Sequence, residues 1–172
     1  LILVAFITII YYSSVFNDDQ IISTTALSDI RPKIIILPFD SQSADANFGS
    51  DQANISFSIN NTLSDLNTDI KFIDSNETKL LAKENLSYKD LADNNDISYV
   101  VTGTIQNSKE FIRVQYRVIE TEFSETIFKE QYDFPKEDNM IEVQEKLAMY
   151  LMKGLSRYIS SKQHVFKYTT EP

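Results

Sequence analysis

Residues 33–40 read Lys-Ile-Ile-Ile-Leu-Pro-Phe-Asp, and this stretch decides the fold of the chain. A run of aliphatic residues without polar alternation predicts a short strand that is buried on both faces. Pro38 has no N–H to donate, so the strand is expected to end there. The segments that follow are expected to cover or extend this strand.

Helix and strand patterns alternate in the next segments. Ser50 or Asp51 is expected to cap a helix, and residues 70–73 predict a second strand that runs parallel to the first. Residues 76–83 predict a short helix, and the pattern of residues 87–90 is that of a capping box that begins another. The first helix is expected to pack on the sheet through four aliphatic side chains at helical spacing: Ile55, Ile59, Leu63 and Leu66.

From Ser98 the apolar period changes to two, which predicts a meander of three strands. Gly103 marks a bulge or a close backbone approach in the first of them. A long helix is expected over residues 140–160, where Gly154 costs helix stability but permits a close approach to the sheet. The sequence thus predicts an α/β (α+β) domain with a single mixed five-stranded sheet, in the order β-α-β-α-β-β-β-α, with helices packed on the sheet.

The composition favours a protein that is not an enzyme. The net charge is −9 without a stripe of Lys or Arg, which argues against direct nucleic-acid contact by this domain. There is no cysteine, and His164 is the single histidine. A Cys–His nucleophile pair is therefore excluded, and a Ser–His pair could use only that one histidine. Asp90, Asp93 and Asp96 lack the glycine and terminal glutamate of a calcium loop, and a solvated helix end is the favoured interpretation. No catalytic residue, metal site or cofactor is predicted, and an unusual hydrolase is the weaker alternative.

The apolar start of the chain predicts an association with a membrane. Residues 1–16 are interpreted as the end of a transmembrane anchor, with a signal-peptide remnant or a core element as alternatives. Residues 17–32 read as a tether, residues 33–162 as the domain and residues 163–172 as a tail. Acidic residues follow the apolar run before any basic one, so the domain is expected in the periplasm, anchored to the inner membrane.

Five segments in order carry a family resemblance. They are Ile-Ile-Ile-Leu-Pro-Phe-Asp at 34–40, Leu-Ala at 91–92 with Ile-Ser-Tyr-Val-Val-Thr-Gly-Thr-Ile at 97–105, Arg-Val-Gln-Tyr-Arg-Val-Ile at 113–119, Ile-Phe-Lys-Glu-Gln-Tyr-Asp at 127–133 and Val-Gln-Glu at 143–145. Together they resemble the TolB amino-terminal-like domains. The chain departs from that pattern at residues 122–125, which lack the usual glycine, and at Phe128, where Trp is usual.

The resemblance implies one of two functions. Such domains form the periplasmic sensor of CadC- and ToxR-like membrane-anchored regulators, in which a winged-helix transcription factor lies in the cytoplasm. This resemblance, with the apolar start, makes a ligand- or partner-binding sensor the first hypothesis. The alternative is an envelope assembly or scaffold module like TolB, CsgG or FlgO.

A ligand site is predicted where the polar loop at residues 40–49 would meet an aromatic strand face. The candidate ligand-binding residues are Phe48, Phe128, Glu130 and Tyr132. Glu130 is predicted on the same side of its strand as the two aromatics. It is either a polar group that lines the pocket, or a charge that protects an edge strand, or a residue that a bulge turns outward. The expected partners are the membrane, an unidentified small molecule, and a second copy or a periplasmic protein.

Overall fold

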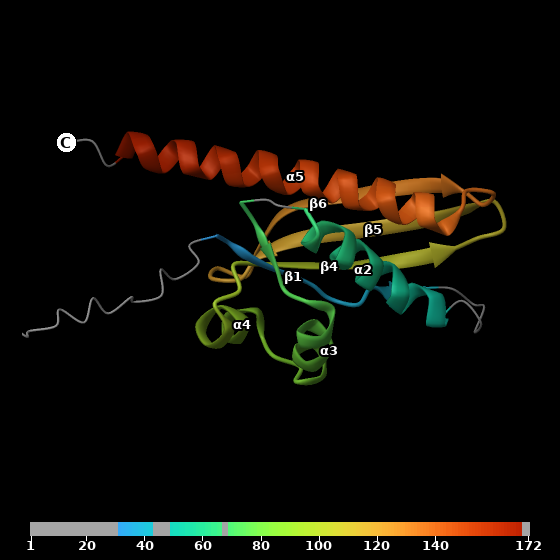
Figure 1. Ribbon diagram of the computed structural model, residues 1–172, viewed down its shortest axis with the longest axis horizontal. Helices are drawn as coiled ribbons and strands as arrows, with labels where there is room; N and C mark the ends of the chain where they lie inside the picture. The colour runs from blue at the N-terminus through green and yellow to red at the C-terminus, as the bar shows by residue number, and fades with distance from the viewer. Residues whose placement is uncertain (1–30, 43–48, 67–68, 170–172) are drawn as a thin grey trace, which may run out of the picture. The chain divides into compact units, whose positions relative to one another are not determined.

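The described residues of a computed structural model form one sheet and four helices, and their arrangement is drawn in Figure 1. The structure describes residues 31–42, 49–66 and 69–169, with the backbone alone over residues 49–54 and 162–169. The elements are β1 (Lys33–Ile36), β2 (Asp40–Ser41), α2 (Gly49–Ser64), β3 (Lys71–Phe72), α3 (Ser75–Lys83), α4 (Tyr88–Asn95), β4 (Tyr99–Asn107), β5 (Phe111–Glu120), β6 (Glu125–Pro135) and α5 (Met140–Thr169).

The strands form one mixed sheet in the order β3-β1-β4-β5-β6, with β2 also paired to β4. β1 pairs in parallel with β3 and β4, whereas β4, β5 and β6 form the antiparallel meander. The mixed architecture is confirmed. The sheet has a sixth strand that the sequence did not predict, because β2 is only two residues long and polar.

β1 is the central parallel strand, as its composition predicts. Ile34, Ile35 and Ile36 are completely buried, since helices cover both faces of the sheet at this point. The strand ends before Pro38. The chain then resumes pairing beside β4, where Asp40 lies next to Thr104. Residue 40 therefore belongs to a short strand, although the sequence placed it in a loop.

The two faces of the sheet are covered differently. α2 and α5 pack on one face, which we call the helix face, and α3 and α4 pack on the opposite face beside β1. In Figure 1, α5 runs along β5 and β6, and α3 and α4 lie on the other side of the sheet. The face of β4, β5 and β6 turned away from α5 carries polar side chains that are exposed or half-buried.

Both glycines singled out by the sequence lie where the backbone needs room. A Cβ on Gly103 would lie 2.4 Å from the carbonyl oxygen of Gln115 on the neighbouring strand. A Cβ on Gly154 would lie 2.8 Å from the ring of Phe128. The prediction of a close helix–sheet approach at Gly154 is therefore confirmed, and Gly103 marks a close strand approach.

Three helix boundaries differ from the sequence pattern. α2 begins at Gly49, ahead of both predicted capping residues, and ends at Ser64, so Leu66 lies beyond it and is 47% exposed. α5 continues to Thr169 instead of ending at Ser160, because no proline or glycine interrupts that segment.

No helix in the described part of the chain is long and apolar enough to cross a membrane. The predicted anchor at residues 1–16, and the tether up to residue 30, lie outside the described residues.

Candidate functional site

The polar face of the meander is the part of the sheet that no described helix covers. We call it the open face. Alternation along three antiparallel strands places every second side chain there. The open face consists of Thr102, Thr104 and Gln106 on β4, Arg113, Gln115 and Arg117 on β5, and Lys129, Gln131 and Asp133 on β6.

Two of the three β5–β6 pairs on the open face are bonded to each other. Arg113 donates two hydrogen bonds of 2.7 Å to the carboxylate of Asp133. The hydrogen-bonded guanidinium lowers the pKa of Asp133, and the carboxylate raises the pKa of Arg113. Gln115 is bonded in a similar way, since its Nε2 donates a hydrogen bond of 2.7 Å to Oε1 of Gln131. These pairs hold the register of the two strands.

The third pair is different because it places two cations opposite each other. Arg117 is the direct cross-strand neighbour of Lys129, and both side chains are exposed. Like charges in this position destabilise a sheet. Neither forms a salt bridge with a carboxylate of the described residues. The pair can therefore attract an acidic group from outside the domain.

A cavity of about 470 Å³, open to solvent, lies over this pair. Asp40 of β2 borders it on one side, and the β6 segment 129–131 borders it on the other. Its walls also include Thr102, Thr104, Gln115 and Arg117. Charged, amide and hydroxyl groups lie in this lining beside the aliphatic parts of the same side chains, so it suits a ligand or a protein surface that presents both polar and apolar groups.

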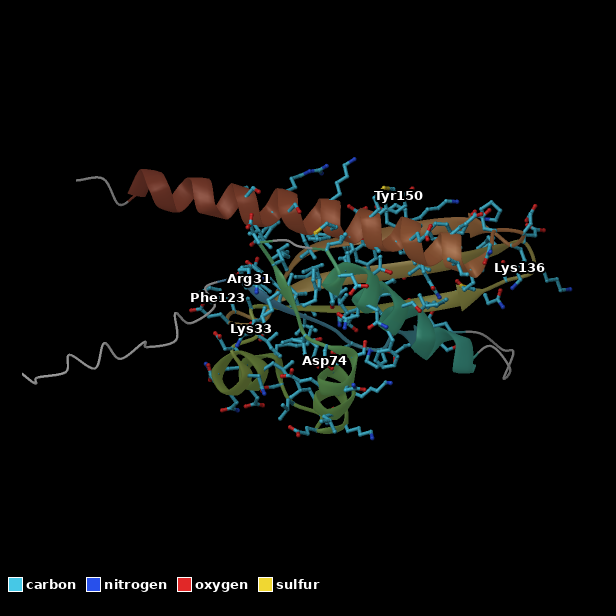
Figure 2. All side chains as sticks on the ribbon, viewed as in Figure 1. Arg31, Lys33, Asp74, Phe123, Lys136 and Tyr150 are labelled. Carbon is cyan, nitrogen blue, oxygen red and sulfur yellow. The ribbon has the colours of Figure 1, made fainter. Side chains whose placement is uncertain are left out.

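The described candidate residues share the strand side that faces α5. Phe128 and Tyr132 lie on the helix face, packed against α5. The ring of Tyr132 stacks on the ring of Tyr150 of α5, with 4.3 Å between the ring centroids, and on the ring of Tyr116, with 6.2 Å between the centroids. Tyr150 is labelled in Figure 2. Phe48 lies outside the described residues. Their role in ligand binding stays a prediction, but the two described aromatics serve as packing between sheet and helix.

Glu130 is exposed and borders the open cavity. The bulge of β6 falls at Ile127, where the register shifts, so it does not turn Glu130 away from its strand side. Glu130 lies opposite Tyr116. Burial is the main reason that the pKa of Tyr116 is raised, and Tyr132 and Glu130 raise it further. Tyr116 is therefore a neutral packing residue at physiological pH.

The three aspartates around α4 have separate structural partners. Asp93 forms an ion pair with Lys89 at 3.3 Å, and Asp96 forms one with Lys33 at 2.9 Å. Asp90 accepts hydrogen bonds from the backbone N–H and the hydroxyl of Ser87, which completes the predicted capping box. Within residues 31–42, 49–66 and 69–169, no group of three His, Cys, Asp or Glu side chains is placed to hold a metal.

Replacing Asp90 by asparagine should make the stability less dependent on acidic pH. The Ser87 hydroxyl, and then its N–H, lower the pKa of Asp90 below 3.8 in the folded protein. This stabilisation is complete above the ordinary pKa and is lost as the pH falls through the lowered pKa. Urea unfolding at pH 7 and pH 3 should show a wild-type advantage over Asp90→Asn that shrinks at pH 3. An equal advantage at both pH values would contradict the assignment.

Sequence reasoning found the wet side of β5 but missed the open-face site. Arg113, Gln115 and Arg117 alternate with buried residues, and that alternation predicts a wet face. The missing information was the β5–β6 register, which places Lys129 beside Arg117. A second missing fact was that α5 returns over the opposite face. The sequence does contain a basic residue on each of the two predicted strands, and aligning the strands so that these residues face each other would have indicated the site.

Comparisons with known proteins agree with this fold. Residues 65–139 match the model of the FlgO protein family, which is somewhat less than half of the chain. No curated protein matches the chain. The crystal structure of lipoprotein GNA1162 from Neisseria meningitidis is similar at a TM-score of 0.52 and 10% identity, covering 73% of this chain and 99% of that one. The chain therefore has the fold of this bacterial lipoprotein.

Two further structural similarities are weaker. The C-terminal domain of LpoB from Salmonella enterica gives a TM-score of 0.47 at 10% identity, covering 62% of this chain and 84% of that one. TolB from Acinetobacter baumannii gives 0.47 at 21% identity, covering 69% of this chain but only 27% of that one. None of these matches connects the chain to CadC- or ToxR-like regulators.

Proposed function

We propose that this chain is an envelope module that works in the periplasm by binding another protein, and that it has no catalytic role. The observation that carries the proposal is the match of residues 65–139 to the FlgO family. This segment runs from the end of α2 through the whole meander, so it contains all three strands of the open face. The fold shared with a bacterial lipoprotein supports the same assignment.

The open face is the proposed docking surface for the partner. Its side chains are exposed or half-buried and polar, which suits a reversible interface more than a permanent one. The adjacent cations Arg117 and Lys129 favour an acidic group on the partner, because a carboxylate between them would relieve their repulsion. The bonded pairs Arg113–Asp133 and Gln115–Gln131 keep the surrounding surface in a fixed geometry.

Arg117→Glu should abolish capture of the partner while leaving the domain folded. The new carboxylate would lie opposite Lys129 and form a favourable cross-strand pair, so the sheet should not lose stability. The tagged wild type and the variant are each cross-linked in cells of the source organism and purified from envelope fractions. The adducts of the two chains are then compared by mass spectrometry. We expect a major envelope adduct with the wild type and at least about a tenfold loss with Arg117→Glu, which corresponds to about 1.4 kcal/mol.

Arg157→Glu is the matched control, since it makes the same change of charge at an exposed position on α5. It should leave the adduct intact. Equal loss with both variants would show a general charge effect, and no loss with either would remove the open face from the proposal. Recovery of no envelope protein by the wild type would contradict the proposed function itself.

The sensor of a membrane-anchored regulator is the other function that the sequence suggested. It depends on the apolar start, which lies outside the described residues. A winged-helix sequence upstream of Leu1 in the full gene would favour the regulator. A cleavable signal with no DNA-binding domain before it would favour the envelope module.

A further inference from the structure

β6 is a long strand at the edge of the sheet. It spans Glu125–Pro135 and pairs with β5 on one side, and no described strand pairs with its other side. The opposite edge of the sheet, β3, has only two residues. A long edge strand presents backbone N–H and C=O groups that can pair with another strand. The β6 edge is therefore the natural place for the sheet to be extended.

The hydrogen bonding to β5 identifies the outward backbone groups. The N–H of Lys136, which Figure 2 labels just beyond β6, donates to the carbonyl of Glu110. In an antiparallel pair such bonded positions alternate with positions whose N–H and C=O point away. Lys129, Gln131 and Asp133 are thus the positions with outward groups. Pro135 falls in the same series, and a proline is tolerated there because its missing N–H would have faced outward.

The sequence of β6 is complementary to itself in one register. If two copies pair antiparallel about Gln131, then Lys129 of each copy lies opposite Asp133 of the other, and Gln131 lies opposite itself. Phe128 of each copy would lie opposite Phe134 of the other, which joins the apolar helix faces. Two ion pairs and two aromatic pairs then flank a central amide pair.

The neighbouring registers are less favourable. Centres at Lys129, Glu130 or Asp133 place identical charges directly opposite each other. A centre at Tyr132 places Lys129 opposite Pro135, which has no N–H to donate. The register about Gln131 is therefore the one in this stretch that both pairs charges and uses the outward backbone groups.

We propose that the chain forms a homodimer in which the β6 edges of two copies pair antiparallel about Gln131, making one continuous sheet. Lys129, which faces Arg117 within its own sheet, gains a carboxylate from Asp133 of the second copy. The proposal concerns the edge of the sheet: it shares Lys129 and Asp133 with the open face, but it needs no partner protein on that face.

A single cysteine tests the register directly, because the chain has no cysteine of its own. In a bonded antiparallel pair the Cα atoms lie about 5.5 Å apart, which matches disulfide geometry. The full chain carrying Gln131→Cys should form a reducible dimer in mild oxidant. Lys129→Cys alone should stay monomeric on a denaturing gel, whereas a mixture of Lys129→Cys and Asp133→Cys chains should cross-link.

Gln115→Cys is the control, since this residue lies on the same face one strand inward. It should not cross-link. Equal cross-linking at Gln115 and Gln131 would overturn the proposed interface, as would a Gln131→Cys chain that remains monomeric.

A second variant tests the dimer without a disulfide. Lys129→Glu faces Arg117 favourably within one copy but would repel Asp133 of the second copy. By sedimentation velocity the wild type should dimerise, and Lys129→Glu should raise the dissociation constant about tenfold with an unchanged circular dichroism spectrum. A monomeric wild type, or an unchanged dissociation constant in Lys129→Glu, would overturn the proposal.

Discussion

Leu151→Ala should lower the free energy of unfolding by about 3 kcal/mol. Leu151 is 2% exposed and belongs to the stripe of α5 that packs on the sheet. Alanine removes three carbons from a packed site and leaves a cavity, because the surrounding side chains relax only partly to fill it. Urea unfolding followed by circular dichroism measures the loss.

Met149→Ala is the control on the same helix. Met149 is 58% exposed, so its truncation should change the unfolding free energy by less than about 0.5 kcal/mol. Similar losses for the two variants would mean that α5 does not dock on the sheet through the Leu151 side.

Gly103→Ala should cost about 2 kcal/mol, although it adds only one methyl group. The new Cβ would lie 2.4 Å from the carbonyl oxygen of Gln115, which belongs to a backbone held by strand pairing on both sides. Overpacking of this kind typically costs 1–3 kcal/mol, and the smaller entropy of unfolded alanine offsets less than about 1 kcal/mol. Urea unfolding of the wild type and the variant measures this difference.

Gly154→Ala provides the comparison for this prediction. Its Cβ would meet the end of the Phe128 ring, which can rotate, and alanine favours the helix by about 1 kcal/mol. The net change should stay within about 1 kcal/mol. If Gly103→Ala were as mild as Gly154→Ala, the close approach of β4 and β5 would be wrong.

Local sequence patterns predicted the individual helices and strands better than the way these pack and pair with one another. The aliphatic run of β1 and the Ser87–Asp90 capping box depend on neighbouring residues, and the structure confirms both. β2 could not be predicted, because two polar residues carry no periodicity and its pairing with β4 is a tertiary contact. The end of α5 was missed for a related reason, since polar residues continue a helix as readily as they leave one.

The candidate site depends on strand register and helix packing more than the individual helices and strands do. A polar loop beside aromatic side chains predicts a ligand site at Phe128 and Tyr132, but α5 packs against both rings. The pairing of Arg117 with Lys129 follows from the β5–β6 register, which includes a bulge that the sequence does not mark. Alternation predicts that a strand has a wet face, but only the path of the helices decides which part of that face stays uncovered.

The claim that a protein partner docks on the open face is tested most directly by photocross-linking at single positions in cells. A photoreactive residue is placed at Gln115 on the open face or at Ser156, an exposed position of α5. We predict an adduct of one defined mass with an envelope protein from Gln115, and none of that mass from Ser156. An adduct from Ser156 alone, or the same adduct from both positions, would contradict the assignment of the open face as the docking surface.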